Sequence, residues 1–363
     1  MSKLFEPVTF RCGATARNAV ALAPLTNQQS HADGTLAEDE RRWLVRRAEG
    51  GFGLVETCAA HVSREGQAFD GQLGTWSDAH LPGLRTLARD VNATGALSIV
   101  QLHHGGARAR PELTGEPTWS ASAFTEDKPG FVPPRAATAA DLERVIGDHE
   151  RAATRVRDAG FGGAELHGAH GYLLGQFLSA KMNRRTDEWG GSLENRARLL
   201  RTVTRKLRAL APAPFVLGVR LSPEDFGQAY GLDLDESVQV ARWLAEDGVN
   251  FVHLSLWNCS RMTTKRPAEH ALPIFRAALP PEVKLIAAGN VWSRGDADAV
   301  LTRGADLVAL GKAAILDPDW PKHAQAPTFE PVRGPLSPEE LEALAISKTL
   351  VSYLRRFKTL VRD

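Results

Sequence analysis

Three side chains that can donate hydrogen bonds or exchange protons follow one short apolar stretch of the sequence. Residues 163–166 are predicted to form a buried strand, and His167, His170 and Tyr172 come just after it. In β/α proteins the chemistry is carried where the strands end. Two imidazoles and a phenol at that place can polarise a carbonyl group, hold developing negative charge and deliver a proton. The sequence therefore predicts an active site here.

Two other interpretations of His167 and His170 remain open from the residues alone. A histidine in a core often does no more than satisfy backbone groups. Metal binding is the second alternative, with His103 and His104 as further ligands. Adjacent residues of a strand point to opposite faces, however, so His103 and His104 cannot both face one ion. We therefore predict no metal site.

The rest of the chain alternates short apolar strands with helices. Helices are expected at residues 37–49, 81–92, 141–159, 193–210, 234–247, 268–279 and 294–303. Strands are expected at residues 19–25, 53–57, 97–102, 163–166, 215–221, 250–255, 284–288 and 307–310. Such strands are typical of a parallel sheet covered by helices, and this number predicts a closed (β/α)₈ TIM barrel. The alternative, a doubly wound open sheet, is disfavoured because no Gly-x-Gly-x-x-Gly follows the first strand.

Three segments are expected outside the barrel. Residues 5–20 should form a hairpin that closes the bottom of the barrel. The Pro-rich but aromatic segment 103–138 is predicted to be a long excursion over the mouth after the third strand, in the manner of a lid or binding loop. Residues 337–363 are predicted to be helical, with Ser337 as the N-cap and Glu340 completing a capping box.

Composition excludes several classes of protein. Lys+Arg 44 against Asp+Glu 43 gives a net charge of +1, without long runs of one sign, so we expect neither a nucleic acid nor a membrane as partner. The N-terminus lacks a signal peptide and no stretch approaches a membrane span, which predicts a soluble, cytoplasmic protein with one domain, residues 1–363. Cys12, Cys58 and Cys259 are odd in number and widely spaced, which disfavours disulfides and zinc.

Polar groups follow several other predicted strands. Gly289 and Gly311 come after the seventh and eighth strands, where barrels often bind phosphate, and Lys312 stands beside the second glycine. A single glycine at a strand end is more often only a turn. Arg220 alternates with Val219 and Leu221, so its charge should face inward if those two face the helices. The alternative for Arg220 is a salt bridge at the end of the barrel.

Residues 161–198 closely resemble the signature segment of the old yellow enzyme family, the flavin-dependent ene-reductases. The resemblance combines His-x-x-His-Gly-Tyr at 167–172 with the run Asn-Arg-Arg-Thr-Asp-Glu-Trp-Gly-Gly-Ser-Leu-Glu-Asn-Arg at 183–196. It extends over most of the chain, from Leu4 to about Pro321. The segment departs from the family at Ala180-Lys181 and at Trp189, in a loop beyond the chemistry.

The resemblance implies that the chain binds FMN non-covalently and uses NADH or NADPH as reductant. It places Arg220 beside the part of the flavin that becomes negative on reduction, and it gives Lys312 the place of a usual phosphate-binding Arg. Thr26 matches the classical branch of the family rather than the bacterial branch with Cys. By this likeness the cofactor-binding residues are Ala23, Pro24, Leu25, Thr26, Thr57, Ala59, Gln101, Arg220, Gly289, Gly311 and Lys312.

The same resemblance implies the reaction. His167 and His170 would bind the carbonyl oxygen of an enone or similar activated alkene, and Tyr172 would protonate the carbon next to that carbonyl. Gln28 stands where bacterial relatives often carry a substrate-contacting Tyr. Tyr230 is expected to reach the mouth, whereas Tyr353 is assigned to the tail.

Three questions remain open at this stage. Arg355 or Arg356 belongs either to a solvated helix face or, as in some relatives, to a neighbouring active site in a homo-oligomer. A flavin-free isomerase or aldolase that binds a sugar phosphate is one alternative activity. A catalytically silent flavin-binding protein is another, and its binding residues would look the same.

Overall fold

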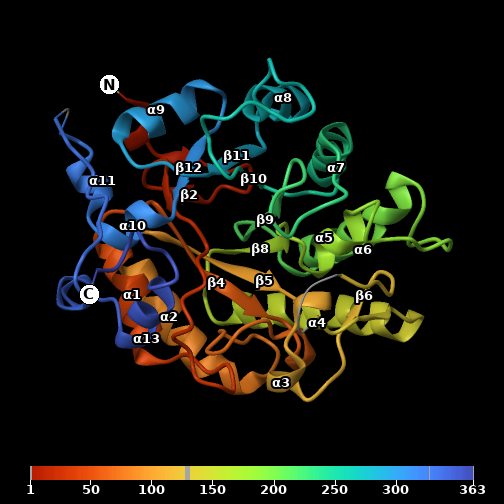
Figure 1. Ribbon diagram of the computed structural model, residues 1–363. Helices are drawn as coiled ribbons and strands as arrows, with labels where there is room; N and C mark the ends of the chain where they lie inside the picture. The colour runs from red at the N-terminus through yellow and green to blue at the C-terminus, as the bar shows by residue number, and fades with distance from the viewer. Residues whose placement is uncertain (1, 127–130, 327, 363) are drawn as a thin grey trace.

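Eight parallel strands close into a barrel (Figure 1). The computed structural model describes residues 2–126, 131–326 and 328–362. Neighbouring strands follow one another around the barrel in chain order, and the last strand pairs with the first. This confirms the predicted TIM barrel. The strands are β3 (Val20–Leu22), β4 (Leu54–His61), β5 (Leu97–His103), β8 (Gly163–Gly168), β9 (Val216–Leu221), β10 (Phe251–Ser255), β11 (Lys284–Ala288) and β12 (Leu307–Leu310).

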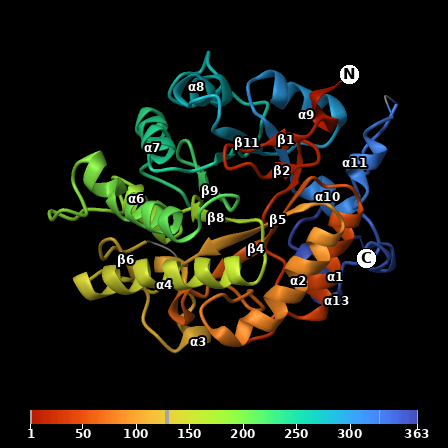
Figure 2. The ribbon, with the colours of Figure 1, turned by 180° about the vertical axis from the view of Figure 1, so that it is seen from behind.

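Helices cover the outside of the barrel, as the views from the front and from behind show (Figures 1 and 2). Side-chain caps fix several of their starts: Thr138 accepts from the backbone N–H of Asp141, and Ser192 from that of Asn195. The apolar stripe of each helix then packs on the outward side chains of the strands. The covering helices are α1 (Glu38–Glu49), α2 (Leu81–Ala93), α4 (Ala139–Asp158), α6 (Leu193–Leu210), α7 (Leu234–Glu246), α8 (Ala271–Ala278) and α9 (Arg294–Thr302).

The interior of the barrel is apolar at its amino end. Leu54, Ile99, Val216 and Phe251 lie in one inner cluster, separate from the layer between strands and helices. The hairpin of β1 (Val8–Thr9) and β2 (Thr15–Ala16) adds Phe10 to this cluster, with ring centroids of Phe10 and Phe251 6.0 Å apart. The hairpin therefore closes the barrel bottom, as predicted, and leaves the carboxyl end for chemistry.

The excursion after β5 contains more regular structure than expected. Its described parts include the 3₁₀ helix η4 (Gly106–Arg108), α3 (Pro111–Thr114) and a parallel pair, β6 (Trp119–Ser120) with β7 (Arg135–Ala136). Residues 127–130 of this segment lie outside the described residues. Trp119 is buried and donates to the Glu65 carboxylate at 3.1 Å. Such contacts fix the excursion to the barrel.

The C-terminal tail differs from the single helix that was expected over residues 337–363. The capping box of Ser337 is present, but α12 (Pro338–Ala343) ends early, and α13 (Lys348–Leu354) starts at its own N-cap, Ser347. Ala345 separates them with a left-handed φ of 60°. This turn lets the apolar side chains of both helices reach the core, which one straight helix would not allow. The other short helices are α5 (Leu173–Leu178), α10 (Lys312–Leu316) and α11 (Trp320–His323).

Among the described helices, none is long and apolar enough to span a membrane.

Candidate active site

The structure brings His167, His170 and Tyr172 together at the carboxyl end of β8. His167 is the penultimate residue of that strand, and Tyr172 is the N-cap residue of α5. The His167 ring lies 5.0 Å, centroid to centroid, from both the His170 ring and the Tyr172 ring. A glycine-rich turn between strand and helix, with His170 itself at a left-handed φ of 58°, makes this convergence possible.

Both imidazoles are held neutral. Burial lowers the pKa of His167 well below its usual value, and the neighbouring rings and cations act in the same direction. The backbone N–H of Ala169 donates to Nδ1 of His167 at 3.3 Å. A neutral imidazole with an accepting Nδ1 carries its proton on Nε2. His167 is therefore a hydrogen-bond donor at Nε2.

His170 is anchored by one residue just after β9 and one at the end of β10. Its backbone N–H donates to Ser222 Oγ at 3.1 Å, and its Nε2 lies 2.6 Å from Ser255 Oγ at the end of β10. Burial lowers the pKa of His170 well below its usual value, with Arg220 and Arg108 adding to the effect. The ring is thereby fixed in orientation and uncharged.

Arg220 lies inside the barrel, next to these histidines. Its neighbours in β9, Val219 and Leu221, pack in the layer under the helices, so the guanidinium points inward. It donates to Ser255 Oγ at 3.3 Å, and its buried Nε has no hydrogen-bond partner among the described residues. Burial lowers the pKa of Arg220, whereas the nearby Glu165 and Glu56 raise it. The result is a buried cation with a free donor.

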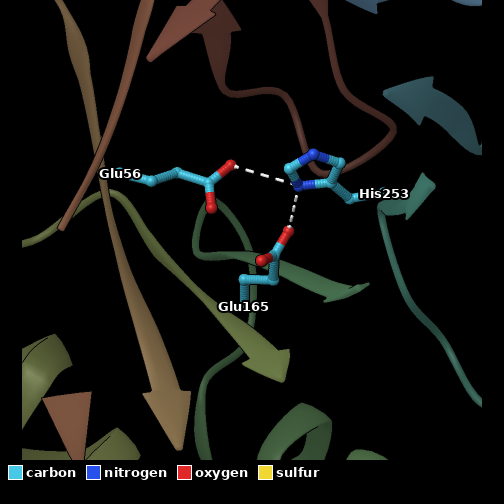
Figure 3. A group of neighbouring side chains, drawn as sticks. All are labelled: Glu56, Glu165 and His253. Carbon is cyan, nitrogen blue, oxygen red and sulfur yellow. Dashed lines mark hydrogen bonds and ion pairs between the residues drawn. The ribbon is translucent and has the colours of Figure 1, made fainter. Parts of the chain in front are cut away.

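Buried ionisable groups form a layer below the histidines, since Glu165 precedes His167 by two residues in β8. Figure 3 shows three members of this layer, Glu56, Glu165 and His253. His253 Nδ1–H donates to Glu165 Oε2 at 2.8 Å, and Gln101 Nε2 donates to Glu165 Oε1 at 2.6 Å. Although burial acts in the opposite direction, His253, Arg220 and Gln101 lower the pKa of Glu165. Glu165 is therefore the ionised member of the layer.

Glu56 is the second carboxyl group of this layer. Its Oε1 lies 3.7 Å from His253 Nδ1, yet neither of its oxygens has a hydrogen-bond partner among the described residues. Burial, and then the charge of Glu165, raise the pKa of Glu56 well above its usual value. Ligand atoms of Glu56, Glu165 and His253 lie within 4.8 Å of one another, a spacing that a metal ion could use. Arg220 already supplies the positive charge that balances Glu165, so charge balance requires no ion.

The residues predicted to line the flavin ring lie around the same mouth. Ala23 follows β3 and donates its backbone N–H to Leu310 at 3.0 Å. Thr57 Oγ1 accepts from the backbone N–H of Gln101 at 3.3 Å. The register of β4 shifts between Glu56 and Ala59, which ends the regular inward alternation there. Pro24, Leu25, Thr26 and Gln28 continue past β3, and Gln28 takes a left-handed φ of 57°.

The three residues predicted to bind the phosphate, Gly289, Gly311 and Lys312, differ in how well the structure supports that role. A Cβ on Gly289 would lie 1.8 Å from the Leu256 carbonyl oxygen, so packing alone requires glycine there. Gly311 is the N-cap residue of α10 and provides no side-chain cap, which leaves first-turn N–H groups for an anion. Lys312 is exposed, with Nζ 5.8 Å from the Phe357 ring centroid. Together with the free Nε of Arg220, these donors fit an anionic cofactor such as FMN.

A cavity of about 410 Å³ reaches the turn that carries His170 and Tyr172, because Gly171 lies in its wall. Its wall includes Gly171, next to Tyr172, and Tyr230, which was expected at the mouth. Most of the remaining wall comes from the excursion after β5, in keeping with a lid or binding loop. The lining residues are Ala68, Ala107, Arg108, Ala109, Arg110, Pro111, Glu112, Thr118, Phe124, Glu126, Phe131, Val132, Gly171, Met182, Gln228 and Tyr230.

Several residues of the site were missed from the sequence. His103 lies 4.3 Å, ring to ring, from Tyr172, and the alternation that turns Gln101 inward would have placed it there. The Ser255 hydroxyl lies between His170 and Arg220. Its position at the end of a predicted strand could have indicated that it belongs to the site. Arg108 lies in the irregular excursion, where no pattern in the sequence indicates a place in the site.

Tyr353 lies in the tail, as expected, but the expectation that Tyr172 and Tyr230 alone among the tyrosines reach the mouth was wrong. The Tyr353 hydroxyl interacts with Thr26, just after β3, and electrostatically with Tyr172. Burial raises the pKa of Tyr353. The break at Ala345 separates α13 from α12, so Tyr353 does not lie on a continuation of α12.

Comparison with known proteins identifies the family. A model described as the NADH:flavin oxidoreductase / NADH oxidase family matches residues 3–328. The chain belongs to this family. It is 35% identical over 323 residues to a probable NADH-dependent flavin oxidoreductase of Bacillus subtilis, covering 87% of this chain and 86% of the relative. It is 33% identical to an NADPH dehydrogenase of Bacillus licheniformis, covering 92% and 97% of the two chains.

A solved structure indicates the group within this family to which the chain is similar. The old yellow enzyme homologue of Zymomonas mobilis matches with a TM-score of 0.81 and 28% identity over 93% of this chain and 96% of that one. The predicted membership of the old yellow enzyme family is thus confirmed, as are the enzyme class, an NAD(P)H-dependent flavin oxidoreductase, and FMN as cofactor. The flavin-free isomerase or aldolase alternative is disfavoured.

Proposed function

We propose that this family member reduces the C=C bond of α,β-unsaturated carbonyl compounds at the carboxyl end of its barrel. The observation that carries the proposal is the pair of neutral, buried imidazoles of His167 and His170 beside the Tyr172 ring. FMN, when bound, supplies hydride-transfer chemistry that no side chain can supply. NADH or NADPH is the source of that hydride.

The two histidines bind the carbonyl oxygen of the alkene. The Nε2–H of His167 would donate one hydrogen bond to that oxygen. The neutral ring of His170, which Ser255 fixes, would donate the other. Donors held in a buried site stabilise the negative charge that develops on the oxygen. Because the imidazoles are neutral, they donate hydrogen bonds to the carbonyl oxygen without transferring a full proton to it.

Tyr172 delivers the proton to the carbon next to the carbonyl. Its ring packs against both His167 and His103, so the phenol is held beside the histidines that would bind the carbonyl. Arg220 places a fixed positive charge under the site, where it stabilises negative charge on the cofactor. Gln28 borders the substrate on the side of β3.

The remaining predicted residues hold the cofactor. Ala23, Pro24, Leu25 and Thr26 after β3 would line the flavin ring, and Gln101 would contact its polar edge. Thr57 and Ala59 would add backbone contacts, while Gly289, Gly311 and Lys312 would hold the phosphate. The cavity of about 410 Å³ has the size of a small-molecule pocket, and most of its wall comes from the excursion after β5.

Steady-state reduction of 2-cyclohexenone by NADH or NADPH tests the proposal. The variants His167→Ala and His170→Ala should lower kcat/KM for the enone at least about tenfold, because each removes a donor to the oxyanion, while flavin content stays near that of the wild type. His31→Ala, at an exposed histidine, is the matched control and should keep wild-type activity. A flavin-loaded protein that oxidises NADH or NADPH but reduces no enone would contradict the proposal.

A further inference from the structure

Arg108 is fixed between two residues of the proposed site. Its guanidinium carbon lies 4.2 Å from the centroid of the Tyr172 ring, in cation–π geometry. Its Nη1 donates to the backbone carbonyl of His170 at 2.6 Å. The same side chain lines the cavity of about 410 Å³. A cation therefore stands at the border between the reacting groups and the substrate cavity.

This cation has no carboxylate partner in the described parts of the chain, 2–126, 131–326 and 328–362. The other charged groups of the cavity wall are already engaged. Arg110 pairs with Asp70 at 2.5 Å and with Glu112 at 2.6 Å, and Glu126 accepts from the Tyr230 hydroxyl at 3.2 Å. A guanidinium has five N–H donors, and the structure assigns one of those of Arg108 to a carbonyl. The Arg108 side chain makes no other hydrogen bond among the described residues, and because it lines the cavity, its remaining N–H groups can bind a ligand there.

We propose that Arg108 binds a carboxylate group of the substrate, so that the enzyme prefers activated alkenes that carry a carboxylate in addition to their activating carbonyl. This inference rests on the proposed function, because it assumes that the carbonyl occupies the histidine pair. A planar guanidinium matches a carboxylate with two parallel hydrogen bonds. Stacking on Tyr172 fixes the plane of that fork before the substrate arrives, which reduces the entropy lost on binding.

The apolar wall of the cavity indicates what the rest of such a substrate should be. The rings of Phe124 and Phe131 pack against each other at a tilt of 39°, with centroids 5.5 Å apart, and Val132 and Met182 also line this apolar part of the wall. An aromatic or branched aliphatic group fits between this wall and the reacting end. The substrate class is thus a small, largely apolar alkene with one anionic end near Arg108.

Binding of a matched pair of phenols tests the inference with a readout other than turnover. The dissociation constants of 4-hydroxybenzoate and of methyl 4-hydroxybenzoate are measured from the flavin absorption change on the FMN-loaded protein. The wild type should favour the acid at least about tenfold, which is about 1.4 kcal/mol. Arg108→Gln should bring the ratio close to one, and Arg108→Lys should restore part of the preference.

Arg110→Gln is the matched control, because Arg110 lines the same cavity but is paired with Asp70 and Glu112. It should keep the wild-type ratio. Raising the ionic strength from about 20 mM to about 300 mM should weaken binding of the acid by the wild type but not binding of the ester. This comparison needs no variant, so it holds even if Arg108→Gln fails to fold.

Two failures are distinguishable. A wild type that binds the ester with the expected absorption change, but shows no preference for the acid or no salt dependence, overturns the role of Arg108 alone. An acid preference that persists in Arg108→Gln overturns it as well. A protein that binds neither phenol overturns the proposed function, together with this inference.

Discussion

The histidines are suited to their proposed role by their environment. An isolated imidazole is partly charged near neutral pH, but burial lowers the pKa of His167 and His170 far enough to keep both neutral. A charged pair so close to Arg220 would repel that guanidinium and each other. Neutral rings avoid this cost and still donate, so the donor function survives in a site that also holds a buried arginine.

Replacement of Tyr172 should slow one half-reaction of the catalytic cycle and leave the other nearly unchanged. Tyr172→Phe keeps the ring that packs on His167 and His103 but removes the hydroxyl proton. We expect it to slow reoxidation of the reduced enzyme by an enone about 10²-fold, in the range of general acid catalysis. Reduction by NADH or NADPH should change less than threefold. Stopped-flow measurement of both steps checks this, and equal slowing of the two would remove the role of proton donor.

The barrel strands show how far the sequence could predict the site. Alternation along a strand turns Gln101, Arg220 and Glu165 inward, and short apolar runs fixed the strand positions within a few residues. The same rule applied two residues further would also have found His103. It could not find Arg108, which lies in the irregular excursion, or Tyr353, whose helix α13 follows the left-handed turn at Ala345; the paths of both segments depend on tertiary contacts rather than on a repeating pattern.

The turn between α12 and α13 carries local strain. Ala345 holds a left-handed φ of 60°, which costs an L-residue about 1–2 kcal/mol. Ala345→Gly relieves this but loses chain entropy, so the net gain in unfolding free energy should be about 0.5–1 kcal/mol. Ala343→Gly, in the adjoining helix α12, should instead lose about 0.5–1 kcal/mol. Thermal melts compare the two, and a destabilised Ala345→Gly variant would contradict the assigned strain.

At the scale of the whole molecule, the barrel interior changes from apolar at the hairpin end to charged below the mouth. Buried charges cost free energy unless they are paired. Glu165 is offset by Arg220 and by donors from His253 and Gln101, whereas Glu56 lacks such partners and is kept protonated. The interior thus holds one compensated negative charge beneath the proposed flavin site.

This arrangement predicts how stability depends on pH. The pKa of Glu56 is raised in the folded state, so its contribution to stability is full below the ordinary carboxyl pKa and is lost as pH rises through the folded value. Glu56→Gln cannot ionise, so the variant avoids this loss of stability at high pH. Its unfolding free energy should equal or exceed that of the wild type at pH 8, and the difference should be smaller at pH 5.

The matched variant Glu165→Gln should behave in the opposite way. It leaves the buried Arg220 without its counter-charge and should cost about 3 kcal/mol or more. Urea titrations at both pH values measure these differences. A Glu56→Gln variant that is clearly less stable than the wild type at pH 8 would show that Glu56 is ionised and paired.

The most direct test of the account is the visible absorption spectrum of the purified protein, followed by titration with a simple phenol. We predict a flavin band and, on adding the phenol, a new long-wavelength charge-transfer absorption from a phenolate held by His167 and His170 next to the flavin. A protein that is colourless, and stays so after incubation with FMN and removal of the excess, would contradict the central claim.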